Sequence, residues 1–323
     1  MNDIRKQVYH CNFWVIVMTL RNFRHGEEEN KLGYTFQTKN PLDINMSFRL
    51  ALTLVLLAAT LSGCASFKEV RGFASLAANA ANDETLTRDY IVALDRRKQY
   101  QPPKFHSDLE AQKSRREAQR ASLDLLQQTM TDYMQGMDSL ASGEIRTYDK
   151  SLRDLGASLN KATLLDSNEK EAVGALSTIL SRAVTATYRL HELKKLIGDG
   201  NQPLQNVINA TRKIAKKGIV ADLQVESNLV ERYYDNFMFA PDNPAEPVAM
   251  ALAREARVEA LGRVDSRIRN VQSYDAVLEK ISEGHQYLYD HRDMIGSDGF
   301  NRQLKSHSDE LRTAYRNLLD ISR

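Results

Sequence analysis

The stretch Val248–Leu288, VAMALAREARVEALGRVDSRIRNVQSYDAVLEKISEGHQYL, decides the fold class. Its apolar residues recur at steps of three or four positions, which places them on one face of an α-helix. The residues on this face are Val248, Leu252, Ala256, Ala260, Val264, Ile268, Val271, Tyr274, Leu278, Ile281, His285 and Leu288. A narrow apolar face sustained over this length is typical of helices that pack with coiled-coil-like seams.

Helical spacing continues on both sides of this stretch, from residue 66 onward. Glycine and proline are scarce and gather at a few points, which we interpret as the ends of helices. The expected breaks lie at Asn82–Asp83, Tyr100–Phe105, Ser142–Gly143, Leu164–Asn168, Gly198–Asn201, Ala240–Pro247 and Gly296–Gly299, with Gly218 as a weak point inside a helix. The segments between them have apolar faces over residues 66–98, 107–140, 145–159, 169–197, 201–221, 248–288 and 300–318. We therefore predict an all-α fold, an elongated antiparallel bundle of about seven helices.

The segment that begins at Met46 predicts export from the cytoplasm. Met46–Arg49 is short and basic, and Leu50–Leu61 is apolar and uncharged. A basic start, an apolar core and small residues at the cleavage point are the marks of a secretory signal peptide. The apolar core is too short for a transmembrane helix, which needs about 20 residues.

The end of this segment, Leu61-Ser62-Gly63-Cys64, resembles the lipobox of bacterial lipoproteins. The resemblance implies that the thiol of Cys64 receives a diacylglycerol, that the chain is cleaved before Cys64, and that the new amino group is acylated. Ala65 resembles the residue found in lipoproteins sorted to the outer membrane, since aspartate at that position retains them in the inner membrane. We therefore expect a lipid-anchored protein on the periplasmic side of the outer membrane.

Residues 1–45 precede this leader and have two explanations. A signal peptide normally begins at the translated start, so the simpler explanation is that Met46 is the true start. The other is an extended cytoplasmic region before the apolar core. The expected organisation is an extension without a stable fold at 1–45, a signal peptide at 46–63, a lipidated N-terminus with the first helical segment at 64–105, and the helical bundle at 106–323.

Charge and cysteine content exclude several classes of function. Residues 1–63 hold seven of the 44 basic and five of the 42 acidic side chains, so the rest of the chain has 37 of each. A neutral body is unlike a nucleic-acid-binding protein, which usually has a basic excess. The two cysteines are Cys11 and Cys64. Removal of the leader leaves Cys64 alone, and its lipidation excludes both a disulfide and thiol catalysis.

We find no motif that predicts catalysis, a cofactor or a metal. His191-Glu192-Leu193-Lys194-Lys195 begins like a zinc-protease helix, but Lys195 stands where the second histidine ligand is needed. No Gly-x-Ser-x-Gly motif occurs. An enzyme site built from dispersed residues stays a third, weaker alternative to the two functions below.

Two features are candidates for function. His285 occupies a position on the apolar face, either as a buried group that senses pH or binds a ligand, or, more commonly, as a hydrogen-bonded core histidine. Tyr233, Tyr234, Phe237 and Phe239 form an aromatic run that is either an exposed partner-binding tip or, more commonly, core where helices converge.

The favoured hypothesis is a non-catalytic protein that binds a protein or envelope partner. The alternative is a ligand-binding or sensing bundle with a polar pocket near His285.

Overall fold

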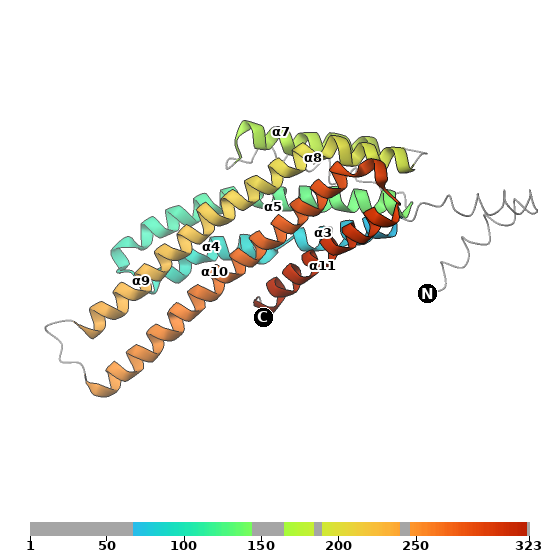
Figure 1. Cartoon of the computed structure of the whole chain (residues 1–323). Helices are drawn as coiled ribbons and strands as arrows, with labels where there is room; N and C mark the ends of the chain where they lie inside the picture. The colour runs from blue at the N-terminus through green and yellow to red at the C-terminus, as the bar shows by residue number, and fades with distance from the viewer. Residues whose placement is uncertain (1–66, 144–164, 184–188, 240–245, 322–323) are drawn as a thin grey trace, which may run out of the picture. The chain divides into compact units, whose positions relative to one another are not determined.

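The computed structural model describes residues 67–143, 165–183, 189–239 and 246–321. These residues form eight α-helices and three short segments of 3-10 or π-helix, and none of them is in a strand. In chain order the elements are α3 (Lys68–Ala81), α4 (Glu84–Lys98), η1 (Pro103–Phe105), α5 (His106–Ser142), α7 (Ser167–Ala183), α8 (Arg189–Lys213), η2 (Ile214–Val220), α9 (Ala221–Met238), α10 (Pro247–Asp290), η3 (Arg292–Met294) and α11 (Asp298–Ile321). The chain divides into two units, Met1–Gly63 and Cys64–Arg323, and every described residue belongs to the second. This unit is an all-α helical bundle (Figure 1).

Most helix ends lie where the sequence predicts them, because capping side chains fix them. Asp83 caps α4, its Oδ1 accepting a hydrogen bond from the amide of Thr85 at 3.0 Å. Asp166 and Glu169 form a reciprocal capping box at the start of α7, with both hydrogen bonds at 2.9 Å. α5 ends at Gly143, whose φ of 77° is a left-handed conformation that favours glycine.

The first three described helices form two layers, with α3 and α4 in one and α5 in the other. α3 and α4 run alongside α5 in the opposite direction. Successive residues of α3 and α4 contact successively earlier residues of α5. Arg71 lies opposite Asp138, and the carbonyl of Ala78 accepts a hydrogen bond from Thr131 at 3.5 Å. Farther along, Tyr90 donates to Gln119.

The second half of the bundle repeats this arrangement on a larger scale. α8, η2 and α9 follow one another without a break, and together they run antiparallel to α10 (Figure 1). Contacts between the two runs join Asn201 to Gln286, Arg212 to Asp275, Glu226 to Arg267 and Glu231 to Arg257. At about 1.5 Å per residue the 44 residues of α10 span about 66 Å. α10 therefore extends along most of the packed layers and then beyond them.

The core lies where α3, α5, α8, α10 and α11 meet. Phe73 of α3 packs so closely against α10 that a Cβ on Gly284 would collide with its ring. The apolar face of α10 is buried from Val271 to Leu288 with His285 among its members, as the sequence predicts. The largest fully buried side chains include Phe73, Leu94, Leu123, Leu126, Met130, Tyr133, Met134, Met137, Leu176, Leu180, Tyr274 and Phe300.

One predicted break is wrong. α8 continues through Gly198–Asn201 and through Pro203 to Lys213. α7 ends at Ala183, and α8, which begins at Arg189, packs alongside it. The expected single helix over residues 169–197 is therefore two helices. Gly200 serves packing rather than termination, because a Cβ there would collide with the ring of Tyr133.

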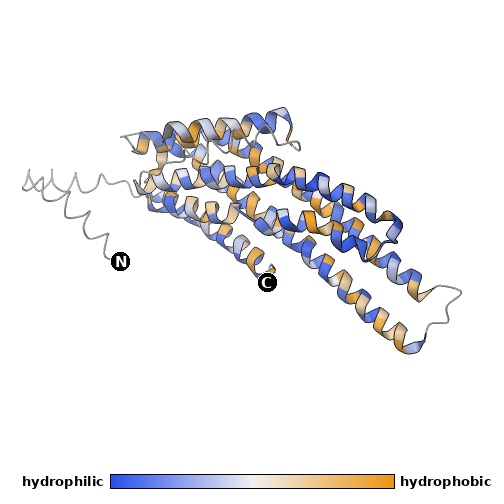
Figure 2. Cartoon of the chain, turned by 180° about the vertical axis from the view of Figure 1, so that it is seen from behind, coloured by the Kyte–Doolittle hydropathy of each residue, from blue (hydrophilic) through white to orange (hydrophobic). Residues whose placement is uncertain are grey.

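The start of the predicted seam in α10 is also wrong. Val248 and Leu252 are each 60% exposed, and the apolar face becomes buried only from Ala260 onward. In the described part of the chain α9 is the one helix packed beside these turns, so one side of them stays open to solvent. The apolar turns near the free ends of α9 and α10 can be seen in Figure 2.

Some predictions fall on residues outside the described ranges. They include the helix at 145–159 and the motif Leu61-Ser62-Gly63-Cys64. Within the described ranges, no helix combines the length and the apolar character needed to cross a membrane.

Candidate functional site

His285 lies at the centre of a buried polar network that joins three helices. Its ring is fully buried on α10. Nδ1 lies 2.9 Å from Oδ1 of Asn201 on α8, and Nε2 lies 2.8 Å from the hydroxyl of Tyr133 on α5. The same hydroxyl is 3.0 Å from the carbonyl oxygen of Leu196. Gly200 makes room for the tyrosine ring. The network therefore ties α5, α8 and α10 together at one level of the bundle.

The network holds a neutral histidine. Desolvation by burial lowers the pKa of His285 to about 3, well below its ordinary value of 6.5. Because Oδ1 of Asn201 is an acceptor, Nδ1 carries the ring proton and Nε2 accepts from Tyr133. The hydroxyl hydrogen of Tyr133 is then shared between His285 and Leu196. Burial and the charge of Asp199 raise the pKa of Tyr133 far above its ordinary value, so this hydroxyl stays protonated.

These contacts favour the core-histidine interpretation of His285 over a ligand pocket. Both ring nitrogens are engaged by side chains of this chain, and the ring edge meets Tyr133 at a centroid distance of 5.4 Å. Neither of the two described pockets has His285 in its lining. Tyr133 and Asn201 thus occupy both hydrogen-bonding positions of the ring.

A second polar cluster fixes α9 onto α4 and α5. Arg96 of α4 binds Glu226 of α9 at 2.9 Å and Asp89 at 2.7 Å, and Arg267 of α10 lies 3.5 Å from the same glutamate. Asp222, also on α9, binds both Arg97 and Arg116. Each buried carboxylate thus has cationic partners that compensate for its lost hydration. These pairs position the helix.

Beyond these ion pairs, α9 carries an apolar row that no helix of the described ranges covers. Val225, Leu229, Tyr233 and Phe237 follow one another at steps of four, and we call them the α9 stripe. Val225, Tyr233 and Phe237 are each exposed by more than two fifths, and Leu229 is half-buried. A row spaced in this way normally lies in a bundle core. Its exposure therefore marks an unpartnered face.

A groove runs between the α9 stripe and the segment that joins α4 to α5. Tyr100 and Phe105 form the wall opposite α9, and Tyr100 meets Tyr233 edge to face at a centroid distance of 5.6 Å. Tyr234 packs edge to face against Tyr233 at a centroid distance of 5.2 Å and lies 6.4 Å from Tyr100. The groove has a volume of about 780 Å³ and is open to solvent; we call it the α9 groove. Its lining is Tyr100, Gln101, Pro102, Pro103, Phe105, Leu229, Arg232, Tyr233, Asn236 and Phe237.

The charges around the α9 groove are unbalanced. Arg232 in its lining and Lys104 beside it are exposed, and neither has a carboxylate within 4 Å among the described residues. The remaining acidic residues of α9, Glu231 and Asp235, both lie within 4 Å of Arg257 on α10. The groove therefore presents positive charge beside its apolar surface.

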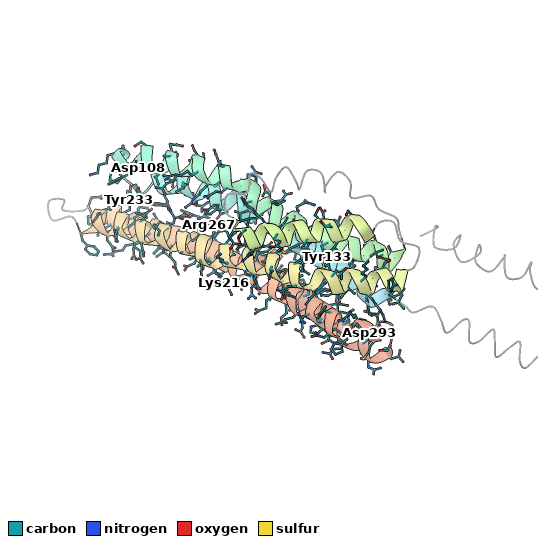
Figure 3. All side chains as sticks on the ribbon, turned by 90° about the horizontal axis from the view of Figure 1, so that it is seen from above. Asp108, Tyr133, Lys216, Tyr233, Arg267 and Asp293 are labelled. Carbon is teal, nitrogen blue, oxygen red and sulfur yellow. The ribbon has the colours of Figure 1, made fainter. Side chains whose placement is uncertain are left out.

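The structure contradicts the favoured interpretation of the aromatic run as core. Tyr233, Phe237 and Phe239 are exposed, the last by 74%, and only Tyr234 is half-buried. The physical reason is the end of α4 at Lys98, which leaves the last turns of α9 with α10 as their one neighbouring helix in the described part of the chain. Figure 3 shows Tyr233 near this end of the bundle and Tyr133 far along it.

Some residues of the α9 groove and of the network around His285 are not among the candidates from the sequence. Only some of them have a pattern in the sequence that identifies them. Val225 and Leu229 could have been found, because they extend the four-residue spacing of Tyr233 and Phe237. Tyr100 carries no such signal, since the fold brings it to α9 from a distant part of the chain. Asn201 lies in the predicted break at Gly198–Asn201, and its contact with His285 depends on the register of α8 against α10.

No group of three or more His, Cys, Asp or Glu residues within the described ranges is arranged to hold a metal ion. Comparisons with protein-family models, with curated proteins and with solved structures found no match to this chain. The functional argument therefore depends on the residues themselves.

Proposed function

We propose that this chain is a lipid-anchored protein of the bacterial cell envelope, and that its helical body binds a protein partner without catalysing a reaction. The proposed anchor is Cys64, acylated after cleavage of a signal peptide, in the outer membrane facing the periplasm. The proposed binding surface is the α9 stripe with its groove.

The leader supports the anchor. The basic Met46–Arg49, the uncharged Leu50–Leu61 and the lipobox-like Leu61–Cys64 occur in the order and register that lipidation requires. Two or more acyl chains make membrane attachment stable, since each buried CH₂ contributes about 0.8 kcal/mol. The described bundle lies entirely in the unit that begins at Cys64.

One observation carries the binding function: an apolar helix row is exposed beside an aromatic groove. Exposed contiguous apolar surface on a soluble body is a common mark of interaction sites, and tyrosine and arginine are the residues that dominate binding energy there. The buried polar groups of the network around His285 are engaged within the fold, so they support a structural role rather than catalysis.

The geometry of α10 suggests why the groove lies where it does. Phe73, near the start of α3, packs at Gly284, whereas the α9 groove lies near the beginning of α10. The helix between Val248 and Gly284 is about 54 Å long. Phe73, which follows the proposed anchor by nine residues, and the α9 groove therefore lie toward opposite ends of α10.

The anchor is tested by the intact mass and membrane fractionation of the protein and of a Cys64→Ala variant. We expect a mature chain that starts at Cys64, with added acyl mass, in the outer-membrane fraction. The variant should lack the acyl mass and leave that fraction. An unlipidated chain that keeps residues 1–45 would refute the anchor.

The binding function is tested by placing a photo-crosslinking residue at position 237 in cells. The matched control is the same residue at position 319, because Phe237 on α9 and Leu319 on α11 are equally exposed, at 44%. We expect light-dependent adducts with an envelope protein from position 237 and none from position 319. Equal adducts from both positions would mean that the α9 stripe has no special role.

A further inference from the structure

The spacing of the α9 stripe specifies the shape of its partner. Val225, Leu229, Tyr233 and Phe237 follow one another at about 6 Å along the helix, so the stripe is about 18 Å long. A polyproline segment presents the same face only every three residues, about 9 Å apart. A second α-helix presents apolar residues at steps of three and four, about 5 to 6 Å apart. The stripe therefore matches an apolar helix face.

The walls of the α9 groove favour the same kind of partner. Phe105 lines the groove together with Leu229 and Phe237 of the stripe, and Tyr100 packs against Tyr233, so an inserted side chain meets apolar surface from both segments. In this type of recognition an amphipathic helix lays its apolar face into a hydrophobic groove through anchors at i, i+3, i+4 and i+7. A volume of about 780 Å³ accommodates several such anchors.

The charges at the rim of the α9 groove indicate the charge that a partner carries. Arg232 lies within the stripe between Leu229 and Tyr233, and Lys104 stands beside Phe105 with its ammonium 5.0 Å from the ring centroid. Neither cation has a carboxylate of the described chain within 4 Å. Glu226 and Asp222 are paired with arginines of α4, and Glu231 and Asp235 share Arg257 at 3.9 and 3.7 Å. A complementary partner carries carboxylates at the edges of its apolar face.

From these three observations we propose that the α9 groove binds an acidic amphipathic helix. The proposal rests on the proposed function, because it names the chemistry of the partner that this surface binds. The anchors of that helix occupy the α9 groove, with Leu229 and Phe237 of the stripe on one side and Phe105 on the other. Its glutamate or aspartate side chains pair with Arg232 and Lys104.

The test measures fluorescence anisotropy of labelled peptides added to the lipidated protein held in neutral phosphatidylcholine nanodiscs. The probe is a three-heptad helix with leucine on its apolar face and glutamate at its edges. A second peptide replaces each glutamate with lysine, and a third is a proline-rich peptide of the same negative charge. We expect the glutamate helix to bind at least about tenfold more tightly than either of the others, and to lose affinity as salt is added.

Charge reversal makes the test specific. The substitution Arg232→Glu should weaken binding of the glutamate helix about tenfold and strengthen binding of the lysine helix. Tyr233→Ser combined with Phe237→Ser should abolish binding of both helices. Leu319→Ser, an equally exposed site on α11, should change neither affinity. All these positions are on the surface, and unchanged circular dichroism and melting curves would establish that each variant is folded.

Several outcomes would overturn the proposal. Equal binding of the glutamate and lysine helices would remove the charge argument. Tighter binding of the proline-rich peptide would assign the groove to an extended ligand. Binding to phosphatidylglycerol vesicles that depends on Tyr233 and Phe237 would assign it to a lipid surface. Concentration-dependent dimerisation lost in the same double variant would assign it to a second copy of the chain.

The result can be separated from the proposed function itself. Crosslinks from position 237 without binding of the glutamate helix would leave the interaction role intact and reject this partner chemistry. Absence of both would reject the interaction role as well.

Discussion

The two ends of α10 have similar sequence patterns and opposite surroundings. Near Gly284 the apolar face is covered by α3, α8 and α11, and the embedded His285 has both nitrogens hydrogen-bonded. Near Val248 the same pattern continues, but its side chains are open to solvent. We call these the closed end and the open end. The difference arises from where the neighbouring helices stop. α4 ends at Lys98, so the last turns of α9 and the first turns of α10 have only each other as helical neighbours in the described part of the chain.

This comparison teaches that helical periodicity identifies which side chains share a face, and that coverage depends on the rest of the fold. At the closed end the apolar face stabilises the bundle. At the open end the same kind of face contributes little to the stability of the chain, and it is free to contact a partner protein. The two ends should therefore respond differently to the same substitution.

The largest expected effect comes from adding a methyl group to a glycine at each end. Gly284→Ala should lower the free energy of unfolding by about 3 kcal/mol, because its Cβ collides with the buried ring of Phe73 and overpacks the core. Gly262→Ala is the matched change toward the open end, where no atom lies within 4 Å of the new Cβ. It should raise the free energy of unfolding by about 0.5 to 1 kcal/mol through helix propensity.

Urea unfolding of the two variants and the parent protein checks this prediction. A loss of stability in Gly262→Ala, or no loss in Gly284→Ala, would show that the two ends are not packed as described.

The next effect concerns pH at the closed end. The pKa of His285 is about 3 in the folded chain and near 6.5 when unfolded, so below pH 6.5 the unfolded chain binds the proton and the folded chain does not. Stability is therefore fully present above pH 6.5 and is lost as the pH falls toward 3, at about 1.4 kcal/mol per pH unit. Between pH 7 and pH 5 the loss should be about 2 kcal/mol.

The control separates this histidine from the other titrating groups. His285→Gln should remove most of the slope between pH 6.5 and pH 4, whereas His191→Gln, at an exposed position on α8, should keep it. Asp275 contributes only at lower pH, because its hydrogen bonds to Arg212 and Lys216 outweigh desolvation and hold its pKa below 3.8. An unchanged slope in His285→Gln would contradict the buried, neutral state.

The sequence predicts the parts of this fold that local chemistry determines. The capping pair Asp166 and Glu169, the cap at Asp83 and the left-handed Gly143 each act within a few residues, so their patterns can be recognised directly. The all-α class follows in the same way, because the three and four spacing is repeated in each segment.

The errors occur where a residue acts across the fold. Glycine is typical of a helix end, yet Gly200 lies inside α8. It leaves space for the ring of Tyr133, which is 67 positions away in the chain. The exposure of Tyr233 could not be predicted either, since it depends on the end of α4. Of the candidate sites, His285 was found because it interrupts an apolar face, whereas its partners Tyr133 and Asn201 required the register between helices.

The smallest expected effect compares one hydroxyl group at each end. Tyr133→Phe should lower the free energy of unfolding by about 1 to 2 kcal/mol, because His285 Nε2 and the carbonyl of Leu196 lose a buried donor. Tyr233→Phe removes the same atom from an exposed ring that stays against Tyr100, and should change stability by less than about 0.5 kcal/mol. Urea unfolding at pH 7 measures both. Equal losses would mean that the two hydroxyl groups contribute equally to the stability of the fold. The α9 stripe would then be part of the core and not an exposed binding surface.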